Sequence, residues 1–275
     1  MTRRSILITG CSSGIGLASA RALKARGWRV LATTRKAEDL TRLNEEEGVE
    51  VLQLDLADPA SVSACAEEAL RRTDDMLFAL FNNSAFAQVG AVEDLSAELF
   101  RRQLEVNVVA THELTRRILP SMRRNGEGRV VQCSSVLGIV AGPFRGAYCA
   151  SKFALEALSD SMRLELRDTG IRVSIIQPGP IYSRFIATAL ANFKRTIDIE
   201  NSPHRDLYLE RLKLMEAGGQ MRFKLQPEAV AAKLVRAVES SRPKACYRVT
   251  TPTHVSAVMK RVLPTRLLDR FLLKM

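Results

Sequence analysis

The fold is decided by the stretch SILITGCSSGIG, residues 5–16. The apolar run over 5–9 predicts a strand, and 14–26 predicts a helix that Gly27 closes. Glycines in the turn between them permit tight backbone angles, and the free N–H groups of a helix start favour an anion. The stretch therefore predicts a pyrophosphate site, with the spacing Gly-x-x-x-Gly-x-Gly, made by Gly10, Ser12, Ser13, Gly14, Ile15 and Gly16.

Apolar runs and helical patterns continue to alternate beyond this stretch. Val-, Ile- and Leu-rich strands that alternate with helices imply a parallel sheet covered on both faces. We expect one α/β domain over residues 1–275, a doubly wound parallel sheet of the Rossmann type. The expected strands are 29–33, 49–54, 76–81, 129–133, 171–177 and 245–250, and the expected helices are 37–47, one opening at Asp58-Pro59, 98–124, 146–168 and 227–240.

Two segments depart from this rhythm. Residues 181–226 have no strand of their own and contain Gly218-Gly219, which favours a helical lid over the substrate. Residues 253–275 form a basic, amphipathic tail. That tail fits either a helix on an anionic membrane surface or a helix packed on the protein or on a second subunit, and Pro264 would interrupt either one.

Composition limits the classes of partner and compartment. The 275 residues are 46% hydrophobic and carry a formal charge of +11. The basic residues occur in pairs along helical patterns, as solvated helix faces would have them, and no nucleic-acid-binding motif is present. Five cysteines without metal or redox spacing, three scattered histidines and no leader or spanning segment favour a cytoplasmic protein without a metal site.

The end of the second expected strand indicates which cofactor is preferred. NAD-binding sheets often carry an acidic residue there for the ribose hydroxyls. This chain has Arg35 and Lys36 instead, and a guanidinium can grip a 2′-phosphate. We therefore expect NADP(H) to be preferred, with NAD(H) also possible; the alternative is that Arg35 merely begins a solvated helix.

A tyrosine and a lysine four residues apart supply the chemistry. Tyr148 and Lys152 project from one face of a helix start. A nearby ammonium lowers the pKa of a phenol, which could then exchange a proton with an alcohol or a carbonyl while a nicotinamide exchanges hydride. Ser135, thirteen residues before Tyr148, could polarise the substrate oxygen, and Ser134 competes for that role.

These residues together resemble the short-chain dehydrogenase/reductase family over roughly residues 5–183. The resemblance rests on the glycine turn and on Asp55-Leu56, Asn82-Asn83-Ser84-Ala85, Asn107, Ser135, Tyr148-x-x-x-Lys152 and Pro178-Gly179-Pro180-Ile181.

The resemblance implies a role for each matched residue. Tyr148 is the general acid/base, Lys152 lowers its pKa and holds the nicotinamide ribose, Ser135 orients the substrate oxygen, and Asn107 anchors a water in the proton relay. The cofactor would meet Asp55 and Leu56, Asn83, Pro178, Gly179, Ile181 and Ser183. One departure is that Ser84-Ala85 stands where the family usually has Ala-Gly, and a positive φ at Ala85 would cost about 1 kcal/mol.

Within the family, the sequence is similar to hydroxysteroid and retinol dehydrogenases and to bacterial NADPH-dependent aldehyde reductases. This resemblance implies a small lipophilic alcohol, aldehyde or ketone as substrate and a homodimer or homotetramer as assembly. A non-catalytic nucleotide-sensing or scaffold protein on the same fold is the alternative. The apolar pocket would be formed by Phe86, Val89, Leu137, Val140, Phe144, Phe185 and Phe193.

Overall fold

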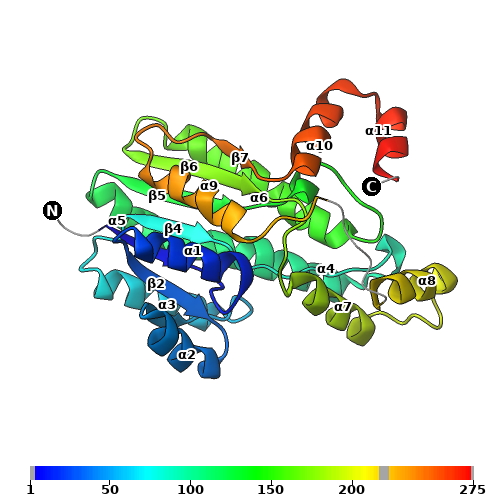
Figure 1. Ribbon diagram of the computed structural model, residues 1–275, viewed down its shortest axis with the longest axis horizontal. Coiled ribbons are helices and arrows are strands. Elements are labelled where there is room, and N and C mark those ends of the chain that lie inside the picture. The colour runs from blue at the N-terminus through cyan, green and yellow to red at the C-terminus, as the bar shows by residue number, and fades with distance from the viewer. Residues whose placement is uncertain (1–3, 217–222, 274–275) are drawn as a thin grey trace.

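A computed structural model describes residues 4–216 and 223–273, and its centre is a seven-stranded parallel sheet (Figure 1). The strand order is β3-β2-β1-β4-β5-β6-β7, and every neighbouring pair is parallel. This confirms the expected doubly wound sheet in a single domain. The strands are β1 (Ser5–Ile8), β2 (Arg29–Thr34), β3 (Glu50–Gln53), β4 (Ala79–Asn82), β5 (Gly128–Cys133), β6 (Ile171–Gln177) and β7 (Cys246–Arg248).

Helices cover both faces of the sheet, because successive side chains of each strand point to opposite faces. In β1, Ile6 and Ile8 pack into one apolar layer and Leu7 packs into the other. The first layer holds α1 (Gly14–Ala25), α2 (Ala37–Glu47) and α9 (Glu228–Glu239). The second holds α3 (Pro59–Arg72), α5 (Ala110–Arg124) and the C-terminal part of α6 (Gly146–Glu165).

The sheet order fixes where a ligand can bind. From β1 the chain runs outward to β2 and β3, and it then returns to β4 on the other side of β1. The crossovers therefore diverge at the carboxyl ends of β1 and β4, and open α/β sheets bind ligands at such a switch point. The glycine turn after β1 lies at this edge.

One expected helix differs in its interior. The predicted helix 98–124 is divided into α4 (Ala97–Leu104), a π-helical turn (Glu105–Val109) and α5. A π-helical turn fits one extra residue into the ladder, and such turns occur often at functional sites. The pattern of apolar residues could not reveal this, since the helix continues on both sides.

The segment 181–226 folds as two helices whose ends are tied together. They are α7 (Phe185–Thr196) and α8 (Arg205–Glu216), which extend beyond one end of the sheet (Figure 1). The Tyr182 amide donates to the Leu225 carbonyl at 2.9 Å, and the Leu225 amide donates to the Pro180 carbonyl at 3.1 Å. The Gly218-Gly219 pair lies outside the described residues, and the role of the segment as a lid stays a prediction.

The C-terminal tail is two helices. Pro264 separates α10 (Thr251–Val262) from α11 (Thr265–Leu272), as expected for a residue that interrupts a helix. Leu268 packs against the protein, whereas Leu267 and Leu273 are exposed. Within 4–216 and 223–273, no helix combines the length and the apolar character that crossing a membrane requires.

Candidate active site

One long cavity of about 1000 Å³ runs along the carboxyl edge of the sheet. At one end the glycine turn and the end of β2 form its wall, and at the other end the walls come from α6, α7 and α8. Every expected cofactor and catalytic residue lines this cavity except Gly16 and Asn107.

The glycine turn has the close packing that a phosphate cradle needs. Gly10 and Gly14 have φ values of +73° and +58°, which side chains disfavour. A methyl group on Gly16 would lie 2.1 Å from the Gly10 carbonyl oxygen. Gly16 therefore lets α1 approach the turn from behind the cavity. The Ser13 side chain makes no cap hydrogen bond to α1, and Ser13, Gly14 and Ile15 line the cavity, so the start of the helix fits a pyrophosphate.

The loop after β4 is fastened to this turn. The Thr9 hydroxyl accepts the amides of Asn83 at 2.8 Å and of Ser84 at 2.9 Å. The Asn83 side chain donates to the Thr9 carbonyl at 2.9 Å. The backbone of Ala85 does not have a positive φ, so its methyl group causes no backbone strain. The departure from the family pattern is thus accommodated.

Basic residues gather where the cofactor's adenosine end would lie. Arg35 and Lys36 line the cavity with Asp55 and Leu56, and Lys36 pairs with Glu38 at 2.8 Å. Arg42 of α2 lies at this end as well and was not predicted from the sequence. Its guanidinium donates to the Ser12 carbonyl at 3.0 Å and pairs with Asp39 at 2.7 Å. The helical pattern gave no signal for Arg42, because it is one of several charged residues on α2.

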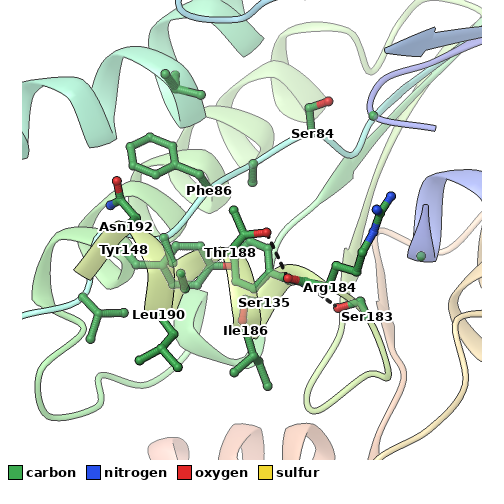
Figure 2. Close-up of a pocket in the computed structure, with 18 of the residues that line it drawn as sticks. Ser84, Phe86, Ser135, Tyr148, Ser183, Arg184, Ile186, Thr188, Leu190 and Asn192 are labelled. Carbon is green, nitrogen blue, oxygen red and sulfur yellow. Dashed lines mark hydrogen bonds between the residues drawn. The ribbon is translucent and has the colours of Figure 1, made fainter. Parts of the chain in front are cut away.

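Tyr148 lies at the middle of the cavity, next to Ser135 (Figure 2). Its side chain is buried, and its ring lies 5.6 Å from that of Phe185. Burial raises the pKa of Tyr148, and hydrogen bonding with the Ser135 hydroxyl lowers it in part. The competing Ser134 hydroxyl is buried and has no hydrogen-bond partner among the described residues. The position of Ser135 beside Tyr148 favours it over Ser134 for the role of orienting the substrate oxygen (Figure 2).

Lys152 is held under the cavity by the sheet. It is only 3% exposed, and its ammonium donates to the Cys133 carbonyl at 2.8 Å. Burial lowers the pKa of Lys152. Desolvation is the largest influence on both groups, and the lowering of the Tyr148 pKa by Lys152 stays a prediction. After burial, which raises the pKa of Tyr148, the positive charge of Arg145 lowers it in part; Arg145 was not predicted from the sequence.

Asn107 lies behind the cavity, in the π-helical turn. Its side-chain amide donates to the Phe86 carbonyl at 2.9 Å and to the Ser151 hydroxyl at 3.1 Å. Its oxygen accepts the Phe86 amide at 3.1 Å. Asn107 therefore joins the wall at Phe86 to α6. The structure does not place it on the cavity surface, where the resemblance implied a contact with relay water.

The loop after β6 closes the cavity from the side of α7. A methyl group on Gly179 would lie 2.1 Å from the Thr250 hydroxyl, so only glycine fits there. Ser183 lines the cavity and accepts the Phe185 amide at 3.4 Å. Arg184 points away from Tyr148 (Figure 2) and donates to the Ser12 carbonyl at 3.2 Å. This link between the loop and the glycine turn was not predicted.

The far end of the cavity is apolar with a basic rim. Six of the seven expected apolar residues line this end of the cavity. The prediction that Val140 lines it is wrong, because its side chain is only 2% exposed and belongs to the core. Four arginines at this end were not predicted from the sequence: Arg102, Arg145, Arg195 and Arg211. They come from four separate parts of the chain, so no local pattern joins them.

The chain matches known proteins over most of its length. The sequence profile described as short chain dehydrogenase matches residues 4–192. The protein "Uncharacterized oxidoreductase YbbO" of Escherichia coli K12 is 44% identical over 270 residues, 98% of this chain and 94% of that protein. Human "17-beta-hydroxysteroid dehydrogenase type 1" is 34% identical over 265 residues, 91% of this chain and 78% of that protein. The crystal structure of a short-chain dehydrogenase from Streptomyces avermitilis superposes with a TM-score of 0.79 at 28% identity, covering 98% of this chain and 94% of that one.

Proposed function

The chain belongs to the short-chain dehydrogenase family of oxidoreductases, and from that premise we propose that it is an NADP(H)-dependent enzyme for lipophilic alcohols, aldehydes or ketones. The observation that carries this proposal is the position of Tyr148. It lies in one cavity, between a phosphate cradle on one side and an apolar pocket on the other.

The chain's own residues handle the proton. When bound, the nicotinamide supplies hydride for reduction or accepts it in oxidation. In reduction, Tyr148 gives its phenolic proton to the carbonyl oxygen, and the product is an alcohol. In oxidation, the phenolate takes the proton from the alcohol. Ser135 orients the same oxygen, and Lys152, fixed by Cys133, holds the nicotinamide ribose.

Charge at the adenosine end supports the preference for NADP(H). Arg35, Lys36 and Arg42 lie around the end of β2. The nearby carboxylates of Glu38 and Asp39 are already paired with Lys36 and Arg42. Among the described residues, the guanidinium of Arg35 has no ion pair with a carboxylate, so it can bind a 2′-phosphate bidentately.

The substrate end supports a lipophilic body. Phe86, Leu137, Phe185 and Phe193 line the cavity beyond Tyr148. Burying an apolar side chain's worth of substrate surface there contributes about 2 kcal/mol. A non-catalytic scaffold has less support, because Tyr148 and Lys152 are both buried and both line the cavity. A scaffold protein would not require a tyrosine and a lysine at that place.

Assembly through the long helices is part of the proposal. Large apolar side chains are exposed on this side of the molecule: Phe100, Val109, Phe153, Leu158 and Leu164. Such side chains are typical of a surface that a second copy covers. Light scattering after gel filtration should give the mass of a dimer or a tetramer.

All five cysteines are free thiols, which supports a cytoplasmic location.

A screen of the purified protein tests the proposed function. NADPH absorbance is followed with fatty aldehydes, retinal, ketosteroids and short aldehydes, with NADH in parallel. We expect turnover with NADPH that is faster than with NADH and that increases with the apolar length of the carbonyl compound. The proposal would be rejected if none of the carbonyl compounds were turned over and if neither reduced cofactor were bound.

A further inference from the structure

Positive charge is concentrated at the substrate end of the cavity. Among its described lining residues, the carboxylates are Glu38, Asp39 and Asp55, and all three lie at the adenosine end. The other end has four guanidinium groups and no carboxylate in the described part of the chain. Four like charges around one space repel each other. A neutral lipophilic substrate has no negative charge that would offset this repulsion.

Arg145 and Arg211 are the pair that the geometry singles out. Arg145 precedes α6, three residues before Tyr148, and Arg211 comes from α8. Desolvation lowers the pKa of Arg145, and the positive charge of Arg211 lowers it further. Both residues are exposed and line the same end of the cavity, and the Arg211 guanidinium lies over the ring of Phe144, the residue before Arg145. Within residues 4–216 and 223–273, neither arginine forms an ion pair with a carboxylate, and no carboxylate lines their end of the cavity.

Phe144, which precedes Arg145 and contacts Arg211, has a strained backbone. This strain indicates that surrounding contacts hold the two arginines in place. Phe144 has a φ of +61°, a left-handed conformation that is unfavourable for a bulky side chain. The Arg211 guanidinium stacks over the Phe144 ring at 4.6 Å. Strain of this kind persists where surrounding contacts enforce it, and it is concentrated at functional sites.

Helix α8 is docked firmly enough to keep Arg211 at the cavity. Tyr208, one turn before Arg211, donates to the Asp94 carboxylate at 2.5 Å and accepts the Ala91 amide at 2.6 Å. Its ring packs edge-on against Phe144 at 5.6 Å. Tyr208, Arg211 and Leu212 share one face of α8, since residues three and four apart do so, and all three line the cavity.

We propose that Arg145 and Arg211 bind an anionic oxyacid group, a carboxylate or a phosphate, on the far end of the substrate. This rests on the proposed function and narrows its substrate class to carbonyl compounds or alcohols that have an apolar body and an acidic group. Guanidinium groups bind such oxygens with paired, charge-assisted hydrogen bonds, and an anion between the two arginines removes their repulsion.

Rates with matched substrates test this assignment. The probes are a homologous series of ω-oxo fatty acids, their methyl esters, and ω-oxoalkyl phosphates of equal length. For the best chain length we expect kcat/KM for an acid to exceed that for its ester by about tenfold or more. The phosphate arm shows which of the two anions is preferred. An acid-to-ester ratio near one at every length would overturn the inference.

Variants localise the effect. Arg211→Gln and Arg145→Gln should each reduce the acid-to-ester ratio by about tenfold. Arg205→Gln is the matched control: it removes the same charge from the same helix, but Arg205 pairs with Glu200 and does not line the cavity. It should leave the ratio unchanged. An equal loss of the ratio in Arg205→Gln would mean that general charge attraction, and not this pair, selects the substrate.

A binding measurement separates this inference from the proposed function. Calorimetry with decanoate, which has no carbonyl group to reduce, should show saturable binding to the protein with NADP⁺ present. Binding should weaken in Arg211→Gln and remain in Arg205→Gln. Decanoate binding without any carbonyl reduction would reject the catalytic proposal alone. Carbonyl reduction without decanoate binding and without acid preference would reject the arginine pair alone.

Discussion

The Lys152 ammonium donates a 2.8 Å hydrogen bond to the Cys133 carbonyl, and this bond joins α6 to the carboxyl end of β5. The lysine is therefore not free to move toward Tyr148, and its Nζ lies 5.7 Å from the centre of that ring. A fixed ammonium at this place can serve a bound ribose and the phenol together. Positioning of this kind is what a rigid sheet edge supplies to a reaction.

The first prediction concerns pH. Burial raises the pKa of Tyr148, so the phenol stays protonated well into the alkaline range. Reduction needs the protonated phenol, and its kcat/KM should therefore stay constant from neutral to alkaline pH. Oxidation needs the phenolate, and its kcat/KM should rise with pH by up to tenfold per unit. Initial rates in both directions across a buffer series check this. A reduction rate that falls already near neutral pH would contradict the raised pKa.

The second prediction distinguishes the two neighbouring serines. Ser135→Ala removes the hydroxyl that acts on Tyr148 and should lower kcat/KM by about a hundredfold. Ser134→Ala removes a buried hydroxyl that has no hydrogen-bond partner among the described residues and should lower kcat/KM less than threefold, since no hydrogen bond is lost. Both variants should bind NADPH as the parent protein does, which fluorescence titration measures. The reverse order of effects would assign the role to Ser134.

The third prediction concerns cofactor choice. Arg35→Gln and Arg42→Gln each remove a guanidinium from the expected 2′-phosphate site, so KM for NADPH should rise by about tenfold while KM for NADH stays the same. Arg21→Gln serves as control, because Arg21 pairs with Glu47 on the outside of α1. Steady-state kinetics with both cofactors give the comparison. An unchanged NADPH preference in the double variant Arg35→Gln/Arg42→Gln would reject this site.

The sequence predicted those features that local pattern determines. The apolar runs predicted all seven strands, and the glycine turn predicted the start of α1, because both follow from residues adjacent in the chain. The cavity also contains nearly all the expected cofactor residues. Their roles with a bound cofactor stay predictions.

The rest depended on contacts between distant segments. Arg42 and Arg184 meet at the Ser12 carbonyl although Arg184 is 172 positions away from Ser12. The basic rim at the substrate end likewise forms only when α4, the residue before α6, α7 and α8 come together. The balance between burial and nearby charge at Tyr148 needed the structure as well, since desolvation cannot be read from the spacing of Tyr148 and Lys152.

The rate of carbonyl reduction by Tyr148→Phe tests the central claim most directly. The substitution keeps the ring that packs on Phe185 and removes only the hydroxyl. With NADPH bound to the same extent, single-turnover reduction of the best aldehyde should slow by about a thousandfold. Reduction at the parent rate, with NADPH binding intact, would contradict the assignment of Tyr148 as the proton donor.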